Sequence, residues 1–261
     1  MRVRTSMKAW VLAALVAAPA LAMAQANTPV VAVLYFDNNS FGKDHGDYDG
    51  LGKGIADLLI NDMASNASMR VVERDRIQSI LQEQSLVQTK TIDPQTAVRL
   101  GKLLGAQYMI TGGFMSDGKG TLLVTSRVIS VETGAITNPV KLQSKGDDVL
   151  ALIGQLSTKL NTELKLPARS AALDRKPATS VGETPAAAKQ AGHQAAATTQ
   201  VASAKSQKLD VKTALLYSKA LDEQDNGNPK KAADLYRAVL EKFPEFGPAQ
   251  QNLAKVQKSG H

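Results

Sequence analysis

The chain has 261 residues, a formal net charge of +7 and no cysteine. The length allows one or two domains. The lack of cysteine excludes disulfides, cysteine-ligated metals, thiol catalysis and acylation of an N-terminal cysteine, so a lipoprotein is not expected. The surplus positive charge lies in residues 1–24 and 167–208. The rest of the chain is balanced in charge, which argues against nucleic acid as a partner.

Residues 1–24 are typical of a secretory signal peptide. Arg2, Arg4 and Lys8 precede the short apolar run Trp10–Ala18, and Ala22–Ala24 has the small-x-small pattern of a cleavage site. The polar segment that follows disfavours the alternative of an uncleaved anchor. No later stretch reaches the roughly 18 apolar residues that a transmembrane segment needs. We therefore expect cleavage near this site and a mature protein in the periplasm.

Residues 25–166 predict an α/β domain. The apolar run Val30–Phe36 is typical of a central strand buried on both faces. Pro139 and Lys141 place the last strand at a sheet edge. The expected elements, in the order β-α-β-α-α-β-β-β-α, are strands at 30–36, 69–72, 108–111, 122–131 and 135–143 and helices at 52–67, 75–86, 93–104 and 147–164. This order predicts a mixed β-sheet with covering helices.

The junction between a strand and a helix at residues 69–86 is crowded with charge. Asp75 and Gln78 have the spacing of a capping box at the helix start. Glu73, Arg74 and Arg76 surround it. Neighbouring arginines keep carboxylates ionised, which suits a general acid poorly. We expect these charges to cap the helix or to lie at a subunit or partner interface.

Residues 167–208 are rich in alanine and polar residues and poor in large aliphatic ones, which predicts a disordered linker. Residues 209–258 are again helical in pattern. Small residues at Ala220 and Ala232, with Tyr236 and Pro244, fit the tetratricopeptide pattern of about 34 residues. In that pattern, the concave partner-binding face of the first helix would carry Tyr217, Leu221 and Gln224.

Few residue patterns here indicate chemistry. The loop Asp44–Asp49 clusters carboxylates as a calcium loop does, but it lacks the distal bidentate glutamate, so a solvated acidic loop is favoured. Glycines in Gly50–Gly54 precede a helix without the spacing of a phosphate-binding loop. The histidines are too scattered for a metal triad or a serine–histidine pair. We expect no enzyme activity, no cofactor and no metal.

Four segments together resemble the curli production assembly/transport family, the CsgG-like domain, and the related N-terminal domain of the TolB type. They are VVAVLYFDN at 30–38, GLGKGIADLLINDM at 50–63, RVVERDRIQSILQEQ at 70–84 and RLGKLLGAQYMITGGF at 99–114. The resemblance implies an α/β envelope protein, and its best-known member forms an outer-membrane ring that exports amyloid-fibre subunits. Our leading interpretation is a non-catalytic periplasmic adaptor of a curli-type export system. It would bind envelope proteins through this domain and the helical module, alone or as a homo-oligomer.

Two alternatives stay open. The first is an outer-membrane secretion channel component. The chain departs from the channel former, because it has no cysteine to acylate and its insertion points at Phe114–Gly120 and Lys145–Asp148 are too short for membrane-spanning hairpins. The second is a metal-dependent binder or enzyme that uses the Asp44–Asp49 loop.

Overall fold

The structure is a computed structural model that describes residues 28–42, 45–86, 92–117, 121–145, 148–164 and 208–259. The expected signal peptide, Asp44 and almost all of the expected linker therefore lie outside the described residues. Within the described part, no helix is long and apolar enough to cross a membrane.

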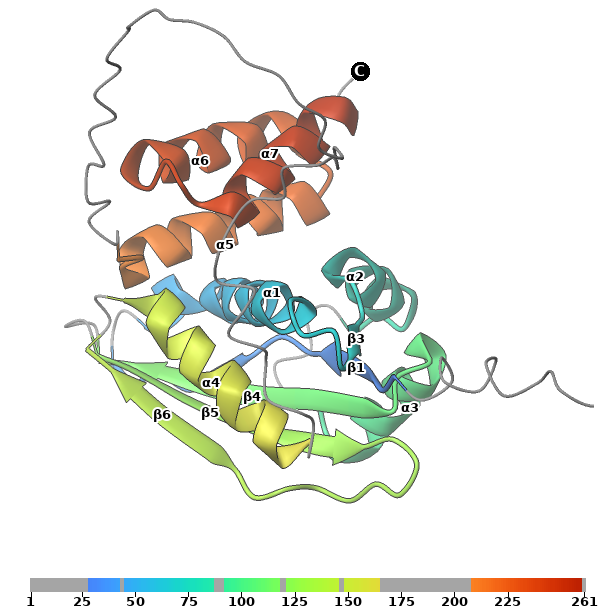
Figure 1. The fold of residues 1–261 in the computed structure, drawn as a ribbon. Coiled ribbons are helices and arrows are strands. Elements are labelled where there is room, and N and C mark those ends of the chain that lie inside the picture. Colours follow the sequence, from blue (N-terminus) through green and yellow to red (C-terminus); the bar gives the residue numbers. More distant parts are fainter. Residues whose placement is uncertain are drawn as a thin grey trace, which may run out of the picture.

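A mixed sheet forms the centre of the molecule (Figure 1). Its strands run in the order β3-β1-β4-β5-β6, and β2 pairs with β4 beyond the end of β1. The pairs β1–β3, β1–β4 and β2–β4 are parallel, whereas β4–β5 and β5–β6 are antiparallel. The strands are β1 Val30–Val33, β2 Asp37–Asn38, β3 Arg70–Val71, β4 Tyr108–Ser116, β5 Leu122–Ser130 and β6 Val140–Ser144.

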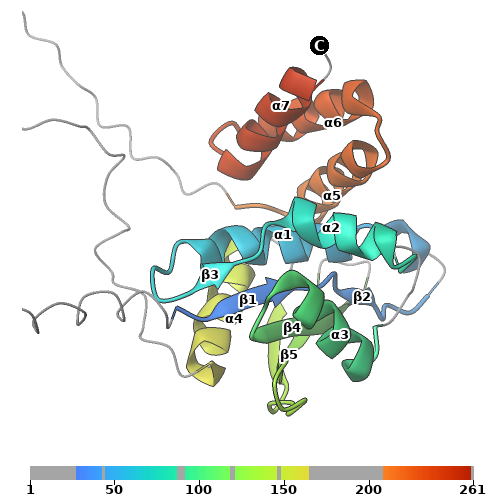
Figure 2. The same ribbon diagram turned by 90° about the vertical axis from the view of Figure 1, so that its right-hand side faces the viewer.

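Helices cover the sheet unevenly. Helix α4 packs against β5 and β6 and also against α1, whereas α3 packs on the other face, against β4 and β5. Helices α5, α6 and α7 form a further layer that lies on α1 (Figures 1 and 2). The helices are α1 Leu51–Ala64, α2 Arg74–Glu83, α3 Pro94–Leu104, α4 Val149–Glu163, α5 Val211–Asp225, α6 Pro229–Lys242 and α7 Gly247–Ser259, with a short 3-10 helix at His45–Tyr48.

The expected fold class is confirmed, and local signals placed several helix ends correctly. The side chain of Asp93 accepts hydrogen bonds from the backbone N–H groups of Gln95 and Thr96, as an N-cap does. Gly105 ends α3 with φ +66°, a left-handed conformation that favours glycine. The last strand, β6, lies at the sheet edge, as Pro139 and Lys141 predicted.

The capping box at Asp75 and Gln78 was predicted wrongly. Helix α2 begins at Arg74, and the N-cap residue Glu73 makes no side-chain cap. The carboxylate of Asp75 instead accepts a hydrogen bond from Arg74 at 2.8 Å. The side-chain carbonyl of Gln78 accepts one from the Tyr35 hydroxyl at 2.7 Å. Lys255 on α7 also donates to the other carboxylate oxygen of Asp75 at 3.3 Å, so both side chains that the capping box would have used have partners elsewhere.

Two further segments differ from expectation. The predicted loop after residue 36 contains β2, because Gly113 on β4 lets the chain approach closely; a Cβ there would lie 2.3 Å from Asn39 Nδ2 and 3.1 Å from the Asp37 carbonyl oxygen. The segment that joins β5 and β6 is also longer than predicted. It makes a single bridge between Ile129 and Ile136 before regular pairing resumes at Val140.

Helix α1 is buried on almost all sides, because it lies between the sheet and α5. Its buried residues include Leu51, Ile55, Leu59 and Met63. Gly52 is required at the crossing with the chain after β1, since a Cβ would lie only 1.8 Å from the Phe36 carbonyl oxygen. A helix on the outside of an α/β domain usually has one exposed polar face, whereas α1 is exposed only near its C-terminal end, at Asn61 and Ala64. This burial shows that the layer formed by α5–α7 completes the core around α1.

Candidate functional site

An ion-pair cluster joins α1 and α2 to the C-terminal end of α5. The Arg74 guanidinium, which is only 4% exposed, donates to both carboxylate oxygens of Asp225, at 2.7 and 2.8 Å. Lys53 on α1 pairs with the same carboxylate at 2.9 Å and also with Asp222, one turn earlier on α5. Charged hydrogen bonds of this kind are among the strongest in proteins when both partners are buried.

A buried carboxylate lies beside this cluster. Asp57 on α1 is 5% exposed and accepts a hydrogen bond from the hydroxyl of Tyr217 on α5. Arg74 Nε lies 3.4 Å from the other oxygen of Asp57, and Asn252 on α7 donates to the Tyr217 hydroxyl at 2.9 Å. Arg74 and Tyr217 therefore meet at one carboxylate, although the sequence separates Tyr217 from Asp57 by 160 residues.

Burial sets the electrostatics of this cluster. Desolvation raises the pKa of Asp57, and the hydrogen bond from Tyr217 and the charge of Arg74 only partly oppose it. Desolvation, together with the charge of Asp57, also raises the pKa of Tyr217 well above that of an exposed tyrosine. For Arg74, burial alone would lower the pKa, but the charge and hydrogen bonds of Asp225 raise it. Arg74 is therefore a permanent cation, and Tyr217 stays a hydrogen-bond donor at neutral pH.

Close helix packing brings these charges together. A Cβ on Gly54 of α1 would lie 1.9 Å from Ser218 Oγ and 3.1 Å from Ser218 Cβ on α5. Ser218 is fully buried, and its hydroxyl donates to the Ala214 carbonyl of its own helix at 2.8 Å. Gly50 and Gly54 therefore lie where α1 meets α5, where the sequence had only suggested a helix entrance.

The structure places the residues predicted to bind a partner in two different settings. Tyr217 and Leu221 are fully buried, and Gln224 accepts a hydrogen bond from the Tyr236 hydroxyl at 2.7 Å. We expected the face of α5 that carries Tyr217 and Leu221 to be open. This is corrected, because α1 of the same chain lies against α5.

The charged residues of the strand–helix junction are also divided. Arg74 belongs to the buried cluster, whereas Glu73 and Arg76 are exposed. Glu73 lines a small polar cavity of about 110 Å³ between the start of α2 and helix α7. The junction thus contributes one buried arginine to an intrachain contact and leaves Glu73, Asp75 and Arg76 exposed.

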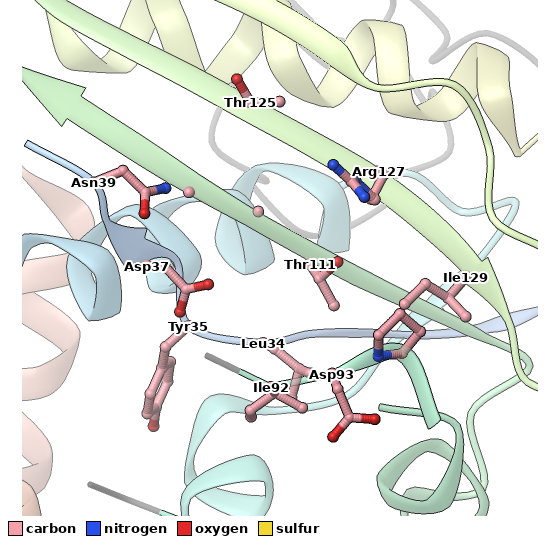
Figure 3. Close-up of a pocket in the computed structure, with 13 residues that line it drawn as sticks. Leu34, Tyr35, Asp37, Asn39, Ile92, Asp93, Thr111, Thr125, Arg127 and Ile129 are labelled. Atoms are coloured by element: carbon pink, nitrogen blue, oxygen red, sulfur yellow. The ribbon is translucent and has the colours of Figure 1, made fainter. Parts of the chain in front are cut away.

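A second candidate site is a pocket of about 420 Å³ on the sheet face opposite α4 (Figure 3). Alternation along β5 creates this face: Val124 and Val128 are buried, whereas Thr125 and Arg127 point the other way. Strand register sets Arg127 opposite Thr111 and Thr125 opposite Gly113. The pocket is lined by Leu34, Tyr35, Asp37, Asn39, Ile92, Asp93, Pro94, Thr111, Gly112, Gly113, Thr125, Arg127 and Ile129.

The pocket lining offers several polar and charged groups. It contains an arginine, two carboxylates, hydroxyls and glycine backbone, and the described lining has no histidine, lysine, serine or cysteine. Hydrogen bonds from Thr96 lower the pKa of Asp93, which is held as the cap of α3. Burial raises the pKa of Tyr35, which therefore remains a neutral phenol. These groups can pair with polar or charged atoms of a partner.

The acidic loop gives no metal centre in the part of the chain that the structure describes. No group of three or more histidine, aspartate or glutamate side chains there is placed to hold a metal ion. Asp49 accepts a hydrogen bond from the Asn38 side chain at 2.8 Å, which ties the loop to β2. Asp44 lies outside the described residues.

Sequence reasoning missed both the α1–α5 contact and the pocket. The contact had two signals: glycines spaced along α1 at Gly50 and Gly54, and acidic residues three apart at Asp222 and Asp225. The pocket had one, the Gly112–Gly113 pair in a strand, which often marks a close backbone approach. A Cβ on Gly112 would lie 2.5 Å from a ring carbon of Phe36.

The α/β part is similar to known proteins. Residues 13–122 match the family model described as curli production assembly/transport component CsgG. Solved structures with a similar fold include the LpoB C-terminal domain from Escherichia coli, at 17% identity and a TM-score of 0.34, covering 45% of this chain and 82% of that one. A PelC dodecamer from Paraburkholderia phytofirmans is similar at 15% identity and a TM-score of 0.34, covering 54% and 89%.

TolB from Acinetobacter baumannii is similar at 11% identity and a TM-score of 0.34, covering 52% of this chain and 28% of that one. Identities and TM-scores this low give no basis for transferring the activity of any of these proteins. Among curated proteins, none matches the chain. The expected resemblance to the curli assembly/transport family is confirmed by the family model alone.

Proposed function

Because the chain carries a CsgG-family domain, matched over residues 13–122, we propose that it is a non-catalytic adaptor of the cell envelope that binds a protein partner across the β4–β5 face. The family is one of envelope and secretion-related proteins, which supports the cellular setting. The observation that carries the proposal is the pocket around Arg127. It lies on the sheet face that α4 does not cover, and its groups suit binding.

The chemistry of this face indicates the kind of partner. Arg127 is exposed, and its guanidinium can hold a carboxylate through two hydrogen bonds. The Thr111 and Thr125 hydroxyls can donate or accept, and Gly112 and Gly113 leave the strand backbone without side chains. An extended segment with an acidic side chain opposite Arg127 would use all of these groups. Arginines in such positions are often binding hot spots.

The export of the protein and its other partner contacts belong to the same proposal. Cleavage of residues 1–24 would deliver the protein to the periplasm, where it would serve a cell-envelope or secretion system of the curli type. We include Glu73 and Arg76 as secondary contacts, because both are exposed at the rim of the ion-pair cluster. Helices α5–α7 have the helix lengths and the small residues of a tetratricopeptide-like module, although here they pack on α1.

Affinity capture from periplasmic extract tests the proposal. Full-length tagged protein should recover a specific partner, and Arg127→Glu should lower the recovery at least tenfold, since truncating a hot-spot arginine costs roughly 2 kcal/mol or more. Arg70→Glu is the matched control, because Arg70 is an exposed strand arginine on β3, away from the pocket. Equal recovery by wild type and Arg127→Glu would show that the partner does not bind at this face.

A further inference from the structure

The surface of α1 and α2 that contacts α5 has all the groups needed to bind that helix specifically. We call it the receptor face, and it comprises Lys53, Gly54, Asp57 and Arg74. The matching ligand face on α5 comprises Tyr217, Ser218, Asp222 and Asp225. The two cations of the receptor meet the two acids of the ligand, the Asp57 carboxylate meets the Tyr217 hydroxyl, and Gly54 makes room for Ser218. The fit is specific in charge, hydrogen bonding and shape.

The connection between α4 and α5 is long enough for the ligand face to come either from the same chain or from a second copy of it. The backbone N–H of Val149, at the start of α4, donates to the Leu209 carbonyl at 2.7 Å, so the chain re-enters the described structure beside the beginning of α4. It leaves the described structure after Leu164, at the end of the same helix. Fifteen helical residues span about 22 Å. Residues 165–207, fully extended, reach about 140 Å. The connection is therefore several times longer than the gap it bridges.

We propose that the receptor face of one copy binds the α5–α7 segment of a second copy, so that chains associate by exchanging this segment. The partner is a second copy because every chain carries both complementary faces, and exchange recreates each contact without loss. Segment exchange of this kind is a low-cost route to dimers. Within one chain, the linked receptor and ligand faces meet at an effective concentration of about 1 mM. Exchange between copies therefore competes with the contact within a chain when the protein concentration approaches this value.

A charge swap at one ion pair tests the exchange in the full-length chain. Arg74→Asp sets two carboxylates against each other within a chain, and Asp225→Arg sets two guanidinium groups against each other. When the two variants are mixed, Asp225 of the first finds Arg74 of the second, and the introduced arginine finds the introduced aspartate. The pair at positions 74 and 225 then has opposite charges, but only between copies; the introduced arginine faces Lys53 in the closed and the exchanged form alike.

The readout is capture of one variant by the other after the two have been refolded together. Tagged Arg74→Asp should recover untagged Asp225→Arg at least tenfold better than it recovers untagged Arg74→Asp. The recovery of untagged Arg74→Asp measures association through any other surface. The chain that carries both substitutions is the matched control. It restores opposite charges at positions 74 and 225 within one chain, so it should be more stable than either single variant, although the introduced arginine still faces Lys53. Equal recovery of the two untagged variants overturns the proposal.

A second pair of variants keeps the wild-type ion pair of Arg74 and covers the case in which charge-swapped chains fail to fold. The sequence has no cysteine, so Gly50→Cys and Asp222→Cys introduce unique thiols. A Cβ on Gly50 would lie 3.0 Å from Asp222 Oδ2, and its φ of −68° accepts any residue. Refolded together at about 1 mM, the two single-cysteine chains should be joined by a short bismaleimide. A cross-link that forms only when both cysteines share one chain overturns the proposal.

Discussion

The two sides of the α/β part differ in how they are closed. On one side α1 lies beneath α5, and the contact buries an arginine, an aspartate and a tyrosine among their partners. On the other side, the β4–β5 face carries an exposed arginine over a pocket of about 420 Å³. Arg74 and Arg127 are both arginines, but Arg74 is buried and paired whereas Arg127 is exposed. Charged side chains of this protein therefore stabilise the fold where they are buried and paired, and are available for binding where they are exposed.

The largest expected effect is at the buried arginine. Arg74→Ala should lower the free energy of unfolding by about 3–5 kcal/mol, because it leaves the buried carboxylate of Asp57 without its nearest cation and leaves Asp225 with Lys53 alone. Urea denaturation followed by circular dichroism measures this. Arg76→Ala is the matched control: Arg76 is exposed two residues away, and its loss should change stability by less than about 0.5 kcal/mol. Equal effects of the two substitutions would contradict the assignment of Arg74 to a stabilising contact.

The next effect tests the close approach of α1 and α5. Gly54→Ala should destabilise by about 1–3 kcal/mol, because the new Cβ must displace Ser218 or separate the helices. Gly154→Ala on α4 is the control, since a Cβ there meets no atom within 4 Å. It should stabilise by about 0.5–1 kcal/mol, the usual gain of alanine over glycine in a helix. If Gly54→Ala also stabilises, the helices do not approach as closely as described.

The sequence predicted those features that depend on neighbours along the chain. Hydrophobic period placed the strands and helices, and the caps at Asp93 and Gly105 followed from residues within one turn. The capping box at Asp75 failed for the opposite reason. Asp75 hydrogen-bonds Arg74 and also pairs with Lys255, 180 residues away in sequence. A local capping motif predicts the start of a helix correctly only when no distant residue binds the side chains of the motif.

The candidate sites depended on information that a single sequence does not display. Arg74 and Asp225 are 151 positions apart, and nothing local in either segment indicates the other. The pocket required the register that sets Arg127 opposite Thr111, which follows from how the whole sheet assembles. The tetratricopeptide-like pattern predicted Tyr217 and Leu221 as part of a partner-binding face. It could not show that α1 of the same chain would lie against that face.

The buried carboxylate makes the closed side sensitive to pH. Burial raises the pKa of Asp57 above its unfolded value of about 4, so the folded state holds this proton more tightly. The contribution of Asp57 is then fully present below that unfolded value and is lost as the pH rises through the folded pKa. Relative to Asp57→Asn, wild type should gain stability as the pH falls from 8 towards 4, by about 1.4 kcal/mol per unit of pKa difference.

Denaturation of both proteins across this pH range gives the measurement. The comparison with Asp57→Asn removes the contributions of Arg74, Asp75 and Lys255, which act on this site in both proteins. Parallel stability curves for the two proteins would show that the carboxylate titrates alike in the folded and unfolded states. A difference that grows as the pH falls would tie the pH dependence to the α1–α5 contact.

The smallest expected effect is on the open side. Arg127→Glu reverses a charge at an exposed strand position, and it should change the free energy of unfolding by less than about 0.5 kcal/mol. The same substitution should lower partner capture at least tenfold, so stability and binding are predicted to separate at Arg127 and not at Arg74. Urea midpoints of wild type, Arg127→Glu and Arg70→Glu should therefore coincide. A loss of more than 1 kcal/mol at Arg127 would mean that this face is held by contacts of its own, and its loss of capture would then report on folding.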